Sequence, residues 1–278
     1  KYYLTPRIND DGYIERILEI CQIENIKLII PLLENGFTIF NQARRLFEAS
    51  GIKLLLSSES VIKICKDKYK LYQYFKGEGI PTPETYLPKD LNGKISFPLF
   101  IKPGTGQGSK NTFMINNKNE LNFFLEYVKN PVIQEYIEGE EYTVDILSDL
   151  DGRVLSAVPR KRVEVRSGEV SKALTVRNEK LIEMSVKIIG DLGVIGPSNL
   201  QVKINKSNEI KIIEINPRFG GGVPLSYQAG VNYPLLLTRM VKEEKVEPFI
   251  GEFEDGLTML RYDSPLFKNM IKLTGAEK

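Results

Sequence analysis

The chain has 278 residues, of which 42% are hydrophobic and 27% charged, a balance typical of a folded soluble protein. Its 38 Lys and Arg residues nearly cancel its 36 Asp and Glu residues, which argues against a dedicated nucleic-acid binder. It has no histidine, so Ser-His-Asp and Cys-His nucleophile pairs, His-based zinc and iron sites and phosphohistidine intermediates are excluded. Acid–base chemistry must therefore fall to carboxylates, Lys, Tyr or Cys.

The two cysteines, Cys21 and Cys65, do not have the spacing of metal ligands, and we interpret them as small buried hydrophobic residues in a reducing compartment. Apolar runs such as 26–30 are far shorter than the roughly 20 residues that a membrane-spanning helix needs. No signal peptide is visible, so we expect a cytoplasmic protein. The chain begins with Lys1 and not with Met, which suggests that an N-terminal piece is missing or processed.

Residues 1–66 alternate between apolar runs typical of strands and stripes of apolar residues at helical spacing. This order predicts parallel strands joined by helical crossovers, in an α/β domain that ends near residue 66. We expect strands at 1–4, 27–33 and 53–56, and helices at 11–24 and 38–50.

Two further helices are predicted at 58–66 and 67–77, and Pro81 and Pro83 then begin a stiff extended link. The next segment, about 98–136, has the pattern of a small lid subdomain. Its predicted elements are strands at 98–103, 112–115 and 131–137, with a helix at 118–128.

The rest of the second domain, which we place at 67–278, also combines strands and helices. The turn Asp151-Gly152 lies between two apolar runs and predicts a hairpin of 141–147 with 153–158. A helix at about 178–192 precedes two strands near 198–205 and 210–216.

These last two strands carry the most informative motif. Glu214 and Asn216 are two residues apart and share one face of a strand. Matching the apolar faces of the two strands requires a four-residue loop at 206–209, and this register places Gln201 opposite Glu214 and Asn199 opposite Asn216. One carboxylate and several amide oxygens would then form a patch suited to a hard cation such as Mg²⁺.

An isolated Glu-x-Asn pair more often lies on a solvated sheet face. Here the strand continues into Arg218, whose planar guanidinium suits phosphate, and then into the glycines of 220–222, which leave bare backbone amides and allow close approach. This context favours the functional interpretation.

The glycine-rich turn after the strand at 98–103 is a weaker signal. Gly104, Gly106 and Gly108 could surround phosphates with their amides, although an ordinary flexible turn has the same pattern. The spacing matches neither a Walker A loop nor a Rossmann fingerprint. Lys102 is more informative, because a cation at the end of a buried strand needs an anionic partner.

A third motif lies at 134–145. Glu135 and Ile137 belong to an extended segment that could offer backbone groups to an adenine edge, and Glu141 could accept from ribose hydroxyls. An acidic surface hinge explains this local pattern equally well.

Taken together, the runs KDKYKLYQYFKGEGIPTP, FIKPGTGQGS, IQEYIEGEEYTVDI, GPSNLQVKIN and IEINPRFGGG resemble the ATP-grasp fold, and in particular single-copy relatives of the carbamoyl-phosphate synthase large subunit. The resemblance covers roughly residues 60–245 with order and spacing preserved. Residues 1–66 resemble the latter part of the Rossmann-like domain that precedes ATP-grasp in that family, without its first strand and helix. The implied fold class is α/β: a truncated pre-ATP-grasp domain followed by two α+β subdomains that enclose ATP.

The resemblance implies roles for residues of each motif. Gln201, where many ATP-grasp enzymes have a carboxylate, is the weakest of the implied ligands. Lys68 and Lys102 would bind the nucleotide phosphates, and the turn from Gly104 to Ser109, including Gly106 and Gly108, would close over them. Glu135 and Ile137 would hold adenine, and Glu141 would hold the ribose. Two Mg²⁺ ions, or Mn²⁺, would be held by Gln201, Glu214 and Asn216, and Arg218 would stabilise the transferring phosphoryl group.

The implied activity is an ATP-dependent ligase reaction in which a carboxylate becomes an acylphosphate and an amine or related nucleophile then displaces phosphate. Arg166, in the basic segment 159–172, is a further candidate for contact with the reacting carboxylate or phosphate, whereas the neighbouring Arg160, Lys161 and Arg162 could form a solvated strand face. We expect small-molecule carboxylate and amine partners, no nucleic acid and no membrane. The oligomeric state stays open, and a homodimer is one alternative.

The sequence bears differently on two other functions, a protein kinase and a nucleotide-binding module without catalysis. A protein kinase would show H-R-D and D-F-G motifs, which this chain lacks. A non-catalytic ATP- or ADP-binding module with the same fold stays open as the alternative.

Overall fold

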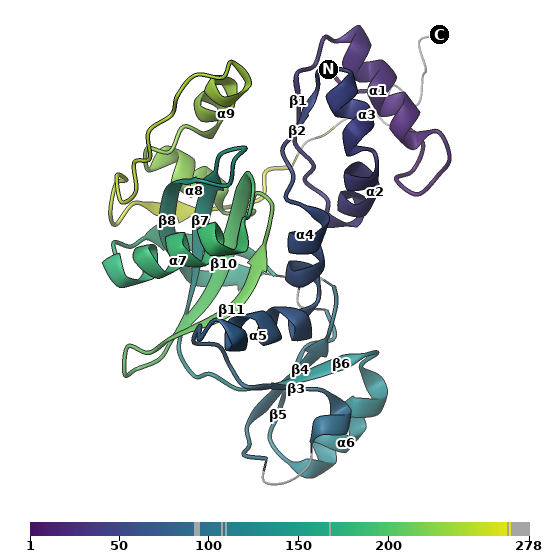
Figure 1. Cartoon of the computed structure of the whole chain (residues 1–278). Coiled ribbons are helices and arrows are strands. Elements are labelled where there is room, and N and C mark those ends of the chain that lie inside the picture. Colours follow the sequence, from purple (N-terminus) through teal and green to yellow (C-terminus); the bar gives the residue numbers. More distant parts are fainter. Residues whose placement is uncertain (92–94, 107, 109, 167, 266, 268–278) are drawn as a thin grey trace.

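The computed structural model describes residues 1–91, 95–106, 108, 110–166, 168–265 and 267. In these residues the chain forms an N-terminal α/β unit, a lid with its own sheet and a larger sheet flanked by helices (Figure 1). None of the described helices is both long enough and apolar enough to cross a bilayer.

The N-terminal unit contains a parallel sheet, as predicted, but with two short strands where three were expected. Residues 1–4 form no strand, contrary to prediction, since they pair with neither strand of that sheet. The run 27–33 pairs at only two residues, and Leu32 and Leu33 are exposed. The elements are α1 (Tyr13–Ile23), β1 (Leu28–Ile29), the 3₁₀ turn η1 (Glu34–Gly36), α2 (Phe37–Gln42), α3 (Arg44–Ala49) and β2 (Lys53–Leu54).

Two helices connect this unit to the lid: α4 (Glu59–Lys66) and α5 (Lys68–Gly77), in agreement with the prediction. The side chain of Asp67 accepts hydrogen bonds from the backbone amides of Tyr69 (3.0 Å) and Lys70 (3.1 Å). Such an N-cap satisfies amides that have no partner within the helix, and it fixes Lys68 at the first position of α5.

The lid is a four-stranded sheet in the order β3-β6-β4-β5. Its core contains Leu99, Ile101 and Ile133 from the strands and Leu121 from α6, which explains why that helix covers the sheet. The elements are β3 (Thr85–Tyr86), the 3₁₀ turn η2 (Pro88–Asp90), β4 (Leu99–Pro103), β5 (Phe113–Ile115), α6 (Lys118–Tyr127) and β6 (Pro131–Glu135).

The larger sheet has six strands in the order β11-β10-β7-β8-β9-β12. Strand β8 continues to Arg166, well beyond the predicted end at 158, because it pairs with β9, which was not predicted. The strands are β7 (Glu140–Ser148), β8 (Val154–Arg166), β9 (Glu169–Thr175), β10 (Pro197–Ile204), β11 (Ile210–Asn216) and β12 (Thr258–Leu260), and the helices are α7 (Glu179–Leu192), α8 (Val223–Gln228) and α9 (Tyr233–Val241).

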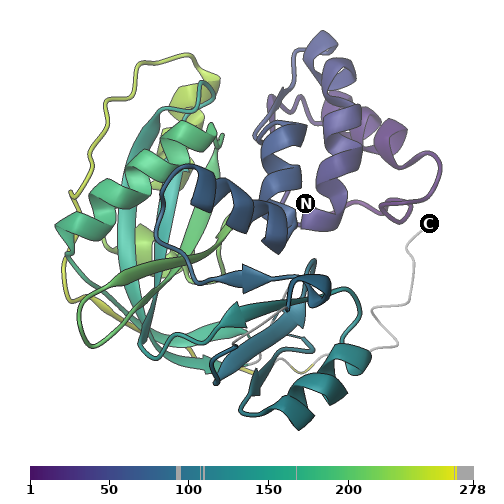
Figure 2. The same cartoon turned by 60° about the horizontal axis from the view of Figure 1, so that its bottom comes forward.

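The β11 edge of the large sheet meets the segment that leads into the lid, since the Ile212 amide donates to the Pro81 carbonyl at 2.8 Å. Figure 2 shows the lid sheet and the large sheet on two sides of the molecule, with α5 between the N-terminal unit and the lid. The predicted fold class, a Rossmann-like N-terminal part followed by two α+β subdomains, is confirmed. The boundary at residue 66 stays a prediction.

The β10–β11 hairpin differs from the prediction in one informative detail. Its loop has five residues, Asn205–Glu209, since Ile204 pairs with Ile210. A bulge at Ile213, which has no partner across the ladder, then restores the predicted pairing of Gln201 with Glu214. The predicted four-residue loop is therefore wrong, while the pairing of the polar residues is confirmed.

Candidate functional site

Polar side chains gather where β10 and β11 pair. Gln201 lies opposite Glu214, and Asn199 lies opposite Asn216. The Asn216 Nδ2 donates to Asn199 Oδ1 and to Glu214 Oε1, both at 3.1 Å. Because the amide nitrogen makes both bonds, the oxygens of Asn216 and Gln201 and the second oxygen of Glu214 are available as acceptors.

This donor set fits Mg²⁺ bound together with a nucleotide. In the described part of the chain, no group of three or more His, Cys, Asp or Glu side chains could hold a metal by itself. One carboxylate and two amide oxygens suit a cation that takes its remaining ligands from phosphate and water, as Mg²⁺ does.

Lys102 lies on β4 with only 6% of its surface exposed. No ion pair or hydrogen bond holds its ammonium group among the described residues. Burial lowers its pKa to about 8, the charge of Glu214 opposes that shift, and the charge of Lys68 adds to it. Glu214 therefore influences Lys102 through its charge without forming an ion pair with it among the described residues. The buried ammonium group is thus available to bind a phosphate.

The glycine-rich turn is attached to the start of α5. The backbone amide of Lys68 donates to Gly104 O (2.9 Å), and Lys68 Nζ donates to Gly106 O (3.1 Å). Gly106 and Gly108 have positive φ angles of 119° and 70°, which favour glycine. Ser109, also predicted to contact phosphate, lies outside the described residues.

The turn also approaches the large sheet. A Cβ on Gly168, in the turn between β8 and β9, would lie 3.2 Å from Gly108 Cα. Arg166, at the end of β8, is 70% exposed and pairs with Glu164 at 2.8 Å. Within the described residues it contacts none of the other predicted site residues through a hydrogen bond or ion pair.

The predicted adenine and ribose residues lie between the lid and the large sheet. Lys203 Nζ, from β10, donates to Ile137 O at 3.1 Å and lies 3.7 Å from a carboxylate oxygen of Glu141. Glu141 also lies 3.6 Å from Arg162, while Glu135 accepts from the Glu84 amide at 3.2 Å. The structure brings these residues together where the chain passes from the lid to the sheet.

A buried ion pair next to the polar residues of β10 and β11 was not predicted. Arg160 of β8 donates from Nε and Nη2 to the two carboxylate oxygens of Asp145 at 2.6 and 2.8 Å. Arg160 is 2% exposed, so its assignment to a solvated strand face was wrong. Burial lowers its pKa, but the charge and hydrogen bonds of Asp145 outweigh that effect and the pKa is raised.

The network continues into the segment after β11, since Ser226 Oγ donates to Asp145 Oδ2 at 2.5 Å. The glycines there allow charged side chains to approach the backbone. A Cβ on Gly221 would lie 2.0 Å from Glu169 Oε2, and one on Gly222 would lie 2.2 Å from Arg160 Nη1. Two of the three glycines are therefore explained by close packing of the protein against itself.

Arg218 has a partner from the N-terminal unit. Its Nε donates to Glu34 Oε1 at 2.9 Å, and its Nη1 donates to the carbonyl of Phe219 at 3.0 Å. Sequence reasoning missed Glu34, because no local pattern relates residues 184 positions apart.

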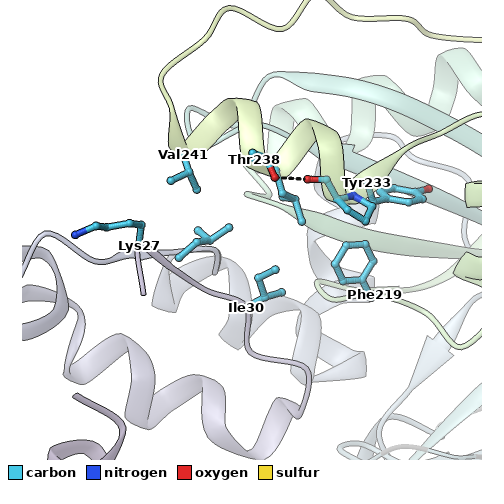
Figure 3. Close-up of a pocket in the computed structure, with 9 residues that line it drawn as sticks. Lys27, Ile30, Phe219, Tyr233, Thr238 and Val241 are labelled. Carbon is cyan, nitrogen blue, oxygen red and sulfur yellow. Dashed lines mark hydrogen bonds between the residues drawn. The ribbon is translucent and has the colours of Figure 1, made fainter. Parts of the chain in front are cut away.

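An apolar cavity of about 460 Å³ lies beside this segment, between β1 and α9. Figure 3 shows Phe219 and Tyr233 at one end of it and Lys27 and Val241 at the other. The rings of Phe219 and Tyr233 meet edge to face at 5.5 Å and form the wall next to Arg218.

Comparison with known families matches two segments of the chain. Residues 1–55 match a family described as the PylC-like N-terminal domain. Residues 128–263 match a family described as ATP-grasp in the biosynthetic pathway with Ter operon. The chain belongs to the ATP-grasp superfamily.

Among curated ATP-grasp relatives, the carbamoyl phosphate synthase large chain of Thermoanaerobacter sp. (strain X514) is 28% identical over 95% of this chain and 26% of its own length. The arginine-specific large chain of Geobacillus stearothermophilus is 25% identical over 90% of this chain and 25% of its own length. This chain therefore spans about a quarter of the length of these relatives.

Solved structures share the ATP-grasp fold. A biotin carboxylase from Campylobacter jejuni, in a β,γ-ATP complex, has a TM-score of 0.74 and 18% identity, covering 90% of this chain and 62% of its own. The biotin carboxylase domain of Hydrogenobacter thermophilus 2-oxoglutarate carboxylase, with MgADP and bicarbonate, has a TM-score of 0.73 and 20% identity. The match covers 89% of this chain and 61% of that domain's chain. An L-amino acid ligase from Bacillus licheniformis has a TM-score of 0.64 and 20% identity, and the match covers 88% of this chain and 65% of the ligase chain.

Proposed function

We propose that this ATP-grasp protein is an ATP-dependent ligase that joins a carboxylate to an amine or a related nucleophile through an acylphosphate. The observation that carries the proposal is the pairing of Gln201 with Glu214, together with the buried Lys102, which has no ion-pair partner among the described residues and whose pKa is affected by the charge of Glu214. A carboxylate patch for a cation and an isolated cation for a phosphate are the two halves of a magnesium–nucleotide site.

In this proposal the nucleotide lies between the lid and the large sheet. Lys68, Lys102 and the turn that includes Gly104, Gly106 and Gly108 bind the phosphates, while Glu135 and Ile137 hold adenine and Glu141 holds the ribose. Gln201, Glu214 and Asn216 hold one or two Mg²⁺ ions. Bound Mg²⁺ supplies neutralisation of the phosphate charge.

The proposed chemistry has two steps. A carboxylate oxygen attacks the γ-phosphorus and ADP leaves, and the nucleophile then attacks the acyl carbon and phosphate leaves. Arg218, Lys102 and Arg166 are proposed to stabilise the charge that develops on the transferring phosphoryl group and on the reacting carboxylate. The docked glycine turn would exclude water, which would otherwise hydrolyse the acylphosphate.

The names of the relatives support this reaction class, because they include a synthase, carboxylases and a ligase that act on small molecules. We extend to this chain the proposal of small-molecule carboxylate and amine substrates, a cytoplasmic setting and, by analogy with a domain dimer among the solved structures, a homodimer. The alternative is a nucleotide-binding module without turnover.

Trapping of the intermediate tests the proposal. The protein is incubated with ATP, Mg²⁺, hydroxylamine and a panel of amino acids, dicarboxylates and bicarbonate, and hydroxamate and phosphate are measured. A ligase forms hydroxamate with at least one carboxylate, because hydroxylamine intercepts the acylphosphate. Tight binding of ATP together with no phosphate release across the panel would support the binding module instead.

A further inference from the structure

Glu34 and Arg218 form one of the few ion pairs in the described structure that are shielded from solvent on both sides. Their side chains are 14% and 22% exposed, and the Nε–Oε1 distance is 2.9 Å. The other described ion pair between the N-terminal unit and the rest of the chain, Lys53 with Glu243, has side chains that are 33% and 79% exposed. Only the first pair involves a residue of the candidate site.

The hydrogen bonds fix the guanidinium in one orientation. Glu34 takes Nε–H, and the Phe219 carbonyl takes one hydrogen of Nη1. Within the described residues, Nη2 donates to no protein group. The guanidinium is thus held at Nε and at Nη1, and its Nη2 group has no bond to any described protein group and is suited to contact with phosphoryl oxygens.

Glu34 is itself held in place by its surroundings. It begins η1, and a Cβ on Gly36 in the same turn would lie 2.4 Å from Ile8 Cδ1, so the turn is tightly packed. The unit that carries it is joined to the large sheet by the buried Ser57, whose Oγ accepts from the Ile195 amide at 3.0 Å. The backbone that carries Glu34 is therefore held against the rest of the chain, and its side chain is only 14% exposed.

We infer that Glu34 is a positioning residue, which aligns Arg218 so that its Nη2 group faces the γ-phosphoryl group, and that the N-terminal unit is thereby part of the active site. This inference rests on the role proposed for Arg218. It assigns to the N-terminal unit a function at the site of phosphoryl transfer, in addition to its own folding.

A double-mutant cycle on the full chain separates positioning from a purely structural role. The affinities of Mg²⁺–AMP-PNP and Mg²⁺–ADP are measured by calorimetry for the wild type, Glu34→Ala, Arg218→Ala and the double variant. We expect Glu34→Ala to weaken AMP-PNP binding about tenfold, the effect of losing one hydrogen bond to a charged group, and to leave ADP binding within about twofold. In the Arg218→Ala background, Glu34→Ala should cause no further loss.

Two matched variants sharpen the cycle. Glu34→Gln keeps the shape and one acceptor oxygen, so it should give a smaller loss, and it replaces Glu34→Ala if that variant does not fold. Glu243→Ala removes the exposed pair with Lys53 and should leave the ratio of AMP-PNP to ADP affinity unchanged.

The outcomes are distinguishable. Equal losses for Glu34→Ala with and without Arg218, or equal losses for ADP and AMP-PNP, would overturn the inference. If Arg218→Ala alone binds AMP-PNP as tightly as the wild type, the proposed role of Arg218 fails, and the positioning role of Glu34 fails with it.

Discussion

Gln201 lies directly opposite Glu214 because a single unpaired residue, Ile213, corrects the register of the β10–β11 hairpin. Without that bulge, the register set near the turn would pair Gln201 with Ile213 and displace the carboxylate from the amide oxygens. The proposed cation patch thus depends on an irregularity of the sheet next to Glu214. Bulges commonly serve to redirect a side chain in this way.

The affinity for ATP should fall as the pH rises through about 8. Lys102 binds phosphate only when protonated, and burial lowers the pKa of the free group to about 8. Below that pH most Lys102 side chains carry a positive charge. Above it most are neutral and must take up a proton before they can bind phosphate. Calorimetric titrations of ATP between pH 7 and 9.5 should show this decrease in the wild type.

The matched variant is Lys102→Arg, because a guanidinium stays charged throughout this range. Its affinity for ATP should be independent of pH, even if lower than that of the wild type at pH 7. A wild-type profile that does not change between pH 7 and 9.5 would contradict the assignment of Lys102 as a phosphate ligand.

Asp145→Asn should destabilise the fold by about 3–5 kcal/mol, because it leaves the buried guanidinium of Arg160 without a compensating charge. Urea denaturation measures this change. Replacement of both residues by apolar ones of similar size should recover part of the loss. A matched control is Glu138→Gln, which removes an exposed pair with Lys206 and should have no measurable effect.

Gly222→Ala should also destabilise the protein, by about 1–3 kcal/mol, since the new Cβ would lie 2.2 Å from Arg160 Nη1 and the arginine is held by Asp145. The control is Gly190→Ala, on the exposed side of α7, where a Cβ meets no atom within 4 Å. That change should raise stability by about 0.5–1 kcal/mol, because alanine favours the helix. Equal effects of the two substitutions in urea denaturation would contradict the close packing of the glycine segment.

Regular features of the fold were predictable because they are local. The helices of 58–66 and 67–77 begin at Ser58 and Asp67, whose side chains cap them. The polar face of β10 and β11 follows from alternation along each strand. The hairpin around Asp151-Gly152 was predicted too, and its register extended along β8 would have placed Arg160 opposite Thr143, diagonal to Asp145.

Other features depend on contacts that no local pattern reveals. Whether residues 1–4 form a strand depends on a partner strand, and the sequence of the segment alone does not supply one. Strand β9 lies between β8 and β12 in the sheet, and its buried and exposed positions do not alternate strictly along the strand. The Glu34–Arg218 pair requires the N-terminal unit to be placed against the segment after β11, which only the three-dimensional structure establishes.

The most direct test of the account is the effect of Glu214→Gln on the magnesium dependence of nucleotide binding and turnover. The substituted amide oxygen can still accept from Asn216 Nδ2, so the thermal unfolding temperature should stay close to that of the wild type. Calorimetry with AMP-PNP, in Mg²⁺ and in EDTA, should show that Mg²⁺ strengthens binding to the wild type and has little effect on the variant, and the variant should release no phosphate from ATP. Magnesium-dependent binding and turnover in Glu214→Gln equal to those of the wild type would contradict the assignment of the β10–β11 pairing as the metal–nucleotide site.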